Sequence, residues 1–418
     1  MRIRLAVCAS AAALGMCAGT VAAAAPPPVA PTSAADAAAS RFDPAALRSA
    51  LNGVHRAGMP GVFAEVRDSG RTWRGASGVA DVTTGRPVNA DLRHRVGSVS
   101  KTFTAAAVMQ QVEQGRIRLD APIGDHLPDL VPGERGRKIT VRMLLNHTSG
   151  IPDYIMYAFP SLQGFPSLPD MSSKSLDENR FREFTPAELI RLGLSAPPTG
   201  DPGGPTGVYS NTNYILLGQL LERVTGTGAE EYIARNVIAP AGLRHTGFPR
   251  GPHIQGPHSR MYESFFGLLD PPRDYSVYTN SWVGPSAGLV STMEDLNRFY
   301  ATLLDGRIVS RSSLEQMQQT LPVRALDGTT IQYGLGLHKV AVPGCGLFWG
   351  HDGSAWGAGT LSLTRADGKR QMSVAINMMR WNELDASGNP RPHPIDEALK
   401  SLYGQALCGD PTATAAHP

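Results

Sequence analysis

The chain has a low net charge, few lysines and few cysteines, and these shortages argue against several classes of protein. Of its 418 residues 18% are charged, and the formal net charge is +3 at pH 7. Proteins that bind nucleic acid or a membrane surface need a clustered basic face, so neither class is indicated. No metal-ligand spacing such as CxxC or HExxH occurs, so no metal ion or cofactor is expected. Hydrophobic residues make up 42% of the chain, which is enough for a sizeable core.

A long apolar run lies at the N-terminus. Arg2 and Arg4 precede an Ala- and Leu-rich stretch, which small residues and three prolines follow. This order is typical of a secretory signal peptide, here over residues 1–24, and the next segment, 25–40, is predicted to be a flexible leader. We therefore expect a secreted, extracellular protein without an integral membrane anchor. A retained membrane helix is the alternative, and the high alanine content disfavours it.

Removal of the signal peptide would leave two of the four cysteines, Cys345 and Cys408. Two remaining thiols in an oxidising compartment tend to pair. Closing so long a loop would add roughly 4 kcal/mol to the stability. Two free buried thiols are the alternative.

Strand-like segments gather at the two ends of the chain, and helices occupy its middle. Extended segments and turn residues over 62–79 predict a hairpin, and strand character returns over 333–376. We expect one α/β (α+β) domain over residues 41–409, followed by a tail over 410–418. Its antiparallel sheet would be built from both chain ends and flanked by helices, with a mostly helical inserted subdomain over about 117–285.

Ser98 and Lys101 form the only SxxK pattern in the sequence. A helix is expected from about Val99 to Gln114, and positions three apart share one helix face, so the hydroxyl and the amine would meet there. The run Ala105–Ala107 would allow this helix to be buried. Burial lowers the pKa of a lysine and makes it a possible base for the serine. A capping serine beside a solvated lysine is the alternative.

Tyr209 and Asn211 are separated by one residue, so in an extended segment their side chains would project together. A nearby ammonium would lower the pKa of the phenol and allow it to relay protons. Tyr278 and Asn280 repeat the pattern. Tyr209 is favoured because an amphipathic helix over 213–224 follows at once, whereas Tyr278 is expected to line a cleft or pack.

A third pattern is His351-Asp352-Gly353, which follows an apolar strand and precedes a further hairpin. A strand edge that carries a donor residue and then a glycine can hold a peptide by strand addition. His245-Thr246-Gly247 repeats the pattern in a loop without that context. A buried structural histidine is the alternative for His351.

The segment Gly284–Gly288 matches GxSxG, the nucleophile elbow of another hydrolase fold. Such an elbow needs a helix that begins at its serine, here Ser286. Ser291 and Glu294 predict a capping box, so the next helix would begin only at Ser291. We expect a turn at this segment and no second nucleophile.

In this order and spacing, the three patterns make the chain resemble the serine beta-lactamase and penicillin-binding protein family. Within it, the secreted D-alanyl-D-alanine carboxypeptidases of actinobacterial type are most similar, from about Phe42 to Gly409. Cys345 and Cys408 also match a disulfide of that subgroup. The segments that carry the resemblance are VGSVSKTFTAA (96–106), LLNHTSGIPDY (144–154), YSNTNYILLG (209–218), SAGLVSTMEDLNRF (286–299), YGLGL (333–337) and GHDG (350–353).

The resemblance implies a serine hydrolase that transfers acyl groups. Ser98 would attack the carbonyl between two D-residues to form an acyl-enzyme, while Lys101 and Tyr209 move the protons. The backbone N–H groups of Ser98 and Ser354 would form the oxyanion hole. The same resemblance gives as further substrate-binding residues Asn211, His351, Gly353, Phe159 and Trp282.

Two residues depart from the pattern of those carboxypeptidases. The carboxypeptidases carry an arginine that binds the terminal carboxylate of the substrate. At that position this sequence has His338, which Lys339 follows. Successive strand residues face opposite sides, so only one of the two can face the cleft, and a neutral His338 would lose the charge-assisted contact. Asp352 stands where a hydroxyl residue is usual, and it would repel a terminal carboxylate if it reaches the site.

The sequence thus predicts a secreted D-Ala-D-Ala carboxypeptidase that acts on peptidoglycan stem peptides and forms a slow, long-lived adduct with beta-lactams. The lost arginine favours an alternative, a D-stereospecific peptidase, esterase or peptide-cyclising acyltransferase that acts on other D-amino-acid peptides. A beta-lactamase is a further alternative. A non-catalytic penicillin-binding module is the last, and the intact Ser98, Lys101 and Tyr209 argue against it.

Overall fold

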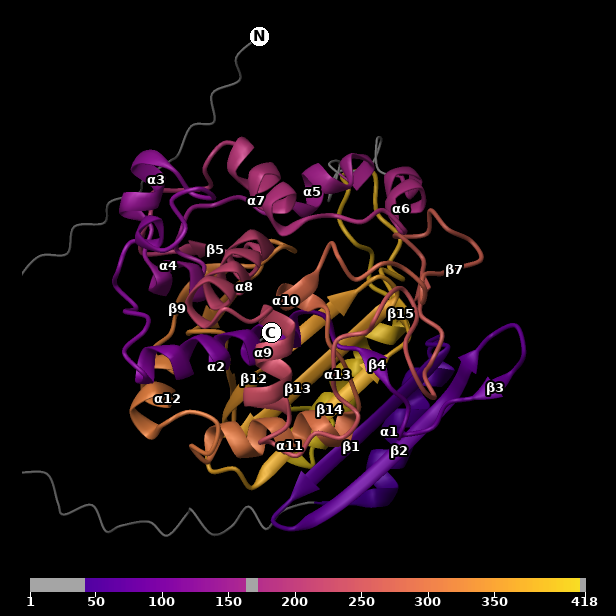
Figure 1. Ribbon diagram of the computed structural model, residues 1–418. Helices are drawn as coiled ribbons and strands as arrows, with labels where there is room; N and C mark the ends of the chain where they lie inside the picture. The colour runs from indigo at the N-terminus through magenta and orange to yellow at the C-terminus, as the bar shows by residue number, and fades with distance from the viewer. Residues whose placement is uncertain (1–41, 163–171, 414–418) are drawn as a thin grey trace, which may run out of the picture. The chain divides into compact units, whose positions relative to one another are not determined.

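A ten-stranded sheet joins the two ends of the chain (Figure 1). The computed structural model describes residues 42–162 and 172–413. The strand order is β3-β2-β1-β14-β13-β12-β11-β10-β9-β5, antiparallel except where β5 pairs with β9. The strands are β1 (Gly61–Asp68), β2 (Arg71–Asp81), β3 (Arg86–Pro87), β5 (Gly207–Val208), β9 (Leu321–Arg324), β10 (Thr330–Tyr333), β11 (His338–Val342), β12 (Gly346–Ala355), β13 (Ala358–Arg365) and β14 (Arg370–Ile376).

The junction between the chain ends is the pairing of β1 with β14. It runs in unbroken register from Val62 opposite Ile376 to Asp68 opposite Arg370. On its other side β1 forms the expected hairpin with β2, which turns at Ser69 and Gly70, both at positive φ. The indigo strands therefore lie beside the yellow ones in Figure 1. The prediction of an antiparallel sheet built from both ends is confirmed.

Helices cover both faces of this sheet. On one face α1 (Pro44–Arg56) and α13 (Pro394–Cys408) pack against each other and share a hydrophobic cluster with β1, β13 and β14. On the other face α11 (Met293–Leu304) contacts β1, β13 and β14. A larger cluster continues from there to α2 (Ser100–Glu113) and α8 (Asn211–Thr225).

The expected helical subdomain corresponds to a succession of short helices with little regular strand. It also carries the small strands β6 (Tyr262–Glu263) and β7 (Arg273–Asp274), which join β15 (Met378–Met379), while β4 (His94–Arg95) pairs with β8 (Val290–Ser291). Its helices besides α8 are α3 (Gly133–Lys138), α4 (Val141–Leu145), α5 (Ile155–Ala158), α6 (Lys174–Asn179), α7 (Pro186–Ser195), α9 (Ala229–Ile233) and α10 (Gly284–Ala287). Helix α12 (Arg311–Met317) follows α11.

Two local expectations are wrong. Helix α11 has Thr292, not Ser291, as its N-cap, and the Thr292 hydroxyl accepts a hydrogen bond from the backbone N–H of Asp295. Ser291 belongs instead to β8, where its backbone pairs with β4. The segment expected to turn is the short helix α10, with Pro285 in its first turn, a position that needs no backbone donor.

The predicted signal peptide and leader (1–40) lie outside the described residues, as does the end of the predicted tail (414–418). The beginning of that tail folds back on α13, because a Cβ on Gly404 would meet the carbonyl oxygen of Ala413 at 2.6 Å. Across residues 42–162 and 172–413, the helices are all too short or too polar to cross a bilayer.

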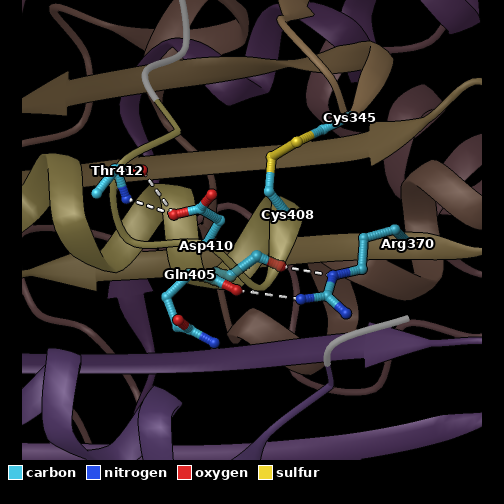
Figure 2. Close-up of a disulfide and its surroundings, with 7 residues drawn as sticks. Cys345, Arg370, Gln405, Cys408, Asp410 and Thr412 are labelled. Atoms are coloured by element: carbon cyan, nitrogen blue, oxygen red, sulfur yellow. Dashed lines mark hydrogen bonds between the residues drawn. A yellow bond between two sulfur atoms is a disulfide. The ribbon is translucent and has the colours of Figure 1, made fainter. Parts of the chain in front are cut away.

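A disulfide joins Cys345, in the turn between β11 and β12, to Cys408 at the end of α13 (Figure 2). The two Cα atoms are 5.5 Å apart. Close by, Arg370 of β14 donates to the backbone carbonyls of Gln405 and Ala406, at 3.1 and 2.6 Å. A cation on the last carbonyls of a helix satisfies unpaired acceptors and complements the helix dipole. The structure joins the two cysteines that were expected to pair, and the bond fixes the end of α13 to the strand pair that carries His338 and Asp352.

We predict that Cys408→Ser lowers the free energy of unfolding by about 4 kcal/mol, because the unfolded chain loses a cross-link that closes a long loop. Equilibrium unfolding in urea would measure the change. A reductant should destabilise the wild type to the same extent and leave the variant unaffected. Equal stability of both proteins without reductant would contradict the prediction.

Candidate active site

Ser98 lies in a 3-10 turn (Gly97–Val99) that runs directly into α2 and packs tightly on β12. Two glycines allow the approach. A Cβ on Gly353 would lie 2.0 Å from the carbonyl oxygen of Val96, and one on Gly97 would lie 2.5 Å from that of Ser354. The Gly353 Cβ would also lie 3.2 Å from the backbone nitrogen of Ser98. The backbones of Ser98 and Ser354, predicted to form the oxyanion hole, are therefore on adjacent segments.

Lys101 lies one helical turn beyond Ser98 and is completely buried. Its Nζ is 3.1 Å from Ser98 Oγ, 2.6 Å from Asn211 Oδ1 and 3.0 Å from the carbonyl oxygen of Ser286. The last two atoms can only accept hydrogen bonds. A neutral amine has two N–H groups and one lone pair, so the two acceptors take its protons and the lone pair faces the serine hydroxyl.

Burial lowers the pKa of Lys101 to about 7, although the carboxylates of Asp153 and Asp352 oppose the shift. A large fraction of the amine is then neutral near pH 7. This is the state in which it can accept the serine proton. The structure places the side chain of Lys101 in the buried position that was expected for it.

Asp153 orients the amide of Asn211. One carboxylate oxygen accepts from Asn211 Nδ2 at 2.7 Å and from its backbone nitrogen at 2.8 Å, and the other accepts from the backbone of Ile155 at 2.8 Å. Burial raises the pKa of Asp153, and these donated hydrogen bonds oppose the shift. Because the carboxylate binds the NH₂ side of the amide, the amide oxygen must face Lys101. Asp153 is thus a positioning residue that acts through Asn211.

Tyr209 approaches the pair from the segment just before α8. Its ring centroid is 4.9 Å from Lys101 Nζ and 4.2 Å from the ring of His147. Burial raises the pKa of the Tyr209 phenol well above its ordinary value, although the nearby Ser98 hydroxyl opposes the shift. The expected fall in this pKa is therefore wrong, because desolvation of the phenolate and the nearby Asp352 carboxylate both raise it. Tyr209 stays a proton donor, and its hydroxyl has no partner among the described residues.

His351 is fully buried and serves as a bridge within the sheet wall. Its Nδ1 is 2.6 Å from the carbonyl oxygen of Asp352, and its Nε2 is 3.0 Å from the hydroxyl of Tyr333. A carbonyl only accepts, so Nδ1 carries a proton, and Nε2 can then accept from the Tyr333 hydroxyl. The alternative of a buried structural histidine describes this side chain better than direct contact with substrate.

His338 and Asp352 both face the cleft, and Lys339 points away and is exposed. Burial lowers the pKa of His338 to about 3, so it is neutral at pH 7. Burial opposes ionisation of Asp352, but the imidazoles of His338 and His351 hold its pKa below the ordinary value. The wall therefore presents a negative charge at the place where the resemblance implies an arginine.

The cleft in front of Ser98 has a volume of about 400 Å³ and a largely apolar lining. The one arginine in the described lining, Arg380, donates to both oxygens of buried Glu263, at 3.0 and 2.6 Å. No unpaired guanidinium in the described lining is thus available for a substrate carboxylate. The predicted site residues that line the cleft are Ser98, Tyr209, Asn211, Trp282, His338 and Ser354.

Three predicted substrate-binding residues, Phe159, His351 and Gly353, do not line the cleft. Phe159 is completely buried behind it, edge-on to Trp282 and Trp356 with ring centroids 5.2 and 5.8 Å away. It supports the aromatic wall that those two tryptophans form. Gly353 provides the space into which the nucleophile's turn packs.

The competing patterns have other roles. Ser286 is buried, and its hydroxyl donates to the carbonyl of Val283 at 2.6 Å, so it is no nucleophile. Its backbone carbonyl, however, binds Lys101, a role that sequence reasoning missed. Tyr278 packs under the guanidinium of Arg95 at 3.9 Å. His245 lines a separate small pocket.

Sequence reasoning also missed Asp153 and His147. Both belong to the segment LLNHTSGIPDY, which carried the resemblance without a role for either residue. The Nδ1 of His147 lies 3.2 Å from the backbone nitrogen of Ser210, and it fixes the segment that holds Tyr209. The one indication of these two residues in the sequence was that their segment resembled the family, as the SxxK and YSN patterns did.

A buried lysine that activates a serine, with a tyrosine beside both, defines a serine hydrolase on this fold. The sequence model described as Beta-lactamase matches residues 47–395, and the chain belongs to that family. It is 27% identical to penicillin-binding protein 4* of Bacillus subtilis, over 80% of this chain and 76% of that protein. It is 26% identical to a D-aminopeptidase of Cereibacter sphaeroides, over 77% of this chain and 57% of that protein.

Among solved structures, a D-stereospecific amidohydrolase from a Streptomyces species superposes with a TM-score of 0.73. The two chains are 32% identical, and the alignment covers 88% of this chain and 99% of the other. The fold expected from the resemblance and the family itself are both confirmed.

We predict that kcat/KM for an ester or amide substrate rises about tenfold per pH unit at low pH and levels off above about pH 7. The sign follows from the role of Lys101 as a base, since only its neutral form accepts the proton. Initial rates across the pH range would measure the profile. A midpoint near the ordinary pKa of lysine would contradict a buried base.

Replacing the orienting carboxylate, by Asp153→Asn, should lower kcat about 10- to 100-fold with little change in KM. The acidic limb of the pH profile should also move to lower pH, because Asp153 raises the pKa of Lys101. Asp125→Asn, at an exposed carboxylate, is the matched control. A lower kcat with an unmoved acidic limb would reduce Asp153 to a structural residue.

Proposed function

We propose that the protein is a D-stereospecific hydrolase that cleaves the amide or ester bond after an apolar D-amino acyl group through an acyl-enzyme on Ser98. One observation carries the proposal. The cleft presents the ionised Asp352 and the neutral His338 where a carboxypeptidase would need a cation for the terminal carboxylate. The likeness to the D-stereospecific amidohydrolase supports the same interpretation.

The reaction would use the groups described above. Ser98 Oγ attacks the carbonyl carbon and its proton passes to the neutral Lys101 Nζ, while the backbone N–H groups of Ser98 and Ser354 bind the oxyanion. The C–N or C–O bond then breaks, and the leaving group takes the proton of the Tyr209 hydroxyl, which the Lys101 ammonium replaces, so that the amine is neutral again. Water attacks the ester on Ser98 and gives a proton to Lys101, and that proton passes to Ser98 Oγ as the acid is released.

The lining of the cleft supports an apolar acyl side chain. Trp282 and Trp356 stack with centroids 5.3 Å apart and form one wall, beside Ile155, Met156 and Phe265. Burying one large apolar side chain there would stabilise the complex by about 1.5–3 kcal/mol. We propose a D-phenylalanyl or D-leucyl group for this place.

The second candidate is the D-Ala-D-Ala carboxypeptidase of peptidoglycan stem peptides. The similarity to penicillin-binding protein 4* favours it, as does the Ser98–Lys101–Tyr209 set. We also propose that the protein is acylated on Ser98 by beta-lactams and that it is secreted. The N-terminal pattern of the sequence and the disulfide, which forms in oxidising compartments, support secretion.

Both candidates make a testable statement about substrates. We expect kcat/KM for D-phenylalanine amide and its methyl ester to exceed that for a diacyl-Lys-D-Ala-D-Ala peptide, and L-phenylalanine amide to be a poor substrate. Ser98→Ala should abolish all turnover and the mass shift that penicillin adds to the peptide containing Ser98. Faster release of D-alanine than of ammonia would establish the carboxypeptidase instead.

A charge variant refines the comparison. Asp352→Asn should raise kcat/KM for the carboxylate-ended peptide about tenfold relative to the amide, because it removes a repulsion within the cleft. Asp327→Asn makes the same change of charge elsewhere in the lining and should have a smaller effect. An unchanged ratio in Asp352→Asn would remove the electrostatic basis of the proposal.

A further inference from the structure

Three potential ligand groups meet in the wall of the cleft, from two neighbouring strands. His338 opens β11 and pairs with Gly350, two residues before Asp352 in β12, and His351 lies between those two. One ligand atom from each of the three side chains can be chosen so that all lie within 4.8 Å of one another. Two of the three, His338 and Asp352, are the very residues at which this sequence departs from the carboxypeptidase pattern.

The two distances to the Asp352 carboxylate fit one small cation. His338 Nδ1 is 3.2 Å and His351 Nδ1 is 3.4 Å from Asp352 Oδ1. Donor atoms bound to one tetrahedral Zn²⁺ at its usual bond lengths lie roughly 3.3–3.5 Å apart. Two imidazoles and one carboxylate also form a common set for a zinc ion whose fourth position stays open.

The two ring nitrogens of His338 are buried without a hydrogen-bond partner in the described structure. The residue is 3% exposed, and neither ring nitrogen has a hydrogen-bond partner among the described residues. A buried polar atom without a partner costs about 1–3 kcal/mol. A metal ion would use one of these nitrogen lone pairs.

Asp352 supplies the negative charge, and a bound divalent ion would make this part of the wall positive, so the proposed repulsion of a substrate carboxylate applies to the metal-free protein. Within the described chain, its ion-pair contacts are with the two imidazoles alone. Its side chain is 49% exposed and lines the cleft, so water or substrate can reach an ion bound there. From these observations we propose that His338, His351 and Asp352 form a binding site for one divalent transition-metal ion, of the Zn²⁺ type, in the cleft wall.

His351 can join the site through a shift of one proton and a rotation of its ring away from the Asp352 carbonyl. Its Nδ1 now donates to the carbonyl of Asp352, and its Nε2 accepts from Tyr333. Moving the ring proton from Nδ1 to Nε2 frees the Nδ1 lone pair for the metal. The hydroxyl of Tyr333 can accept as well as donate, so the bond at Nε2 is retained with its direction reversed. The metal–nitrogen bond replaces the single hydrogen bond that is lost.

The test is metal binding by the folded protein, freed of metal and titrated with ZnCl₂ in a calorimeter. We expect one ion per chain. Because loss of a mere outer-shell partner weakens binding by roughly 10–100-fold, His338→Ala and Asp352→Asn should each weaken it at least about 100-fold. Titration with Co²⁺ should give the intense visible bands of four- or five-coordinate geometry in the wild type and lose them in both variants.

Two control variants separate this site from incidental binding. Asp327→Asn removes a carboxylate from the same cleft, and His253→Ala removes an exposed imidazole; both should bind like the wild type. Wild-type stoichiometry and affinity in His338→Ala or Asp352→Asn would overturn the proposal, as would octahedral Co²⁺ alone. Because none of these measurements uses turnover, failure of the proposed hydrolase activity would leave this result intact.

Discussion

The site depends on one interaction, the burial of the Lys101 amine between two acceptors and the Ser98 hydroxyl. Taking an ammonium out of water is costly, and the protein avoids the cost by making the neutral amine accessible near pH 7. Each neighbour then has a defined role, since the Asn211 oxygen and the Ser286 carbonyl take the two protons while Ser98 faces the lone pair. A solvated lysine at the same position would be a cation and no base.

The scaffold provides this burial through backbone contacts as much as through side chains. Helix α2 is enclosed on nearly all sides, and small residues along it let α8 and α10 approach. Gly97 and Gly353 remove the Cβ atoms that would separate the nucleophile from β12. The lining of the cleft includes the aromatic pair Trp282 and Trp356 as well as His338 and Asp352, so the cleft presents both apolar surface and charge.

Much of the fold and of the candidate site could be predicted from the sequence. The features that could not be predicted depend on contacts across the fold or on burial. Strand-like segments and turn residues located the terminal strands. Local spacing in the sequence paired Ser98 with Lys101 and Tyr209 with Asn211. Asp153 could not be found that way, because it acts through a hydrogen bond across the fold. Nor could the grouping of His338 with Asp352, which depends on strand register. The pKa of Tyr209 was predicted in the wrong direction, since sequence shows a neighbouring charge but not the depth of burial.

The pairing of β1 with β14 has a consequence for folding during synthesis of the protein. Val62 finds its partner only at Ile376, and the strand that faces the nucleophile, β12, is held in the sheet by β13 and thereby by β14. Contacts between such distant positions form late, because the entropy of closing the intervening loop must be met first. During synthesis the chain therefore contains Ser98 and Lys101 long before β12, the strand that faces the nucleophile, is in place. Such a chain has no assembled catalytic centre until β14, which ends at Ile376, has been made.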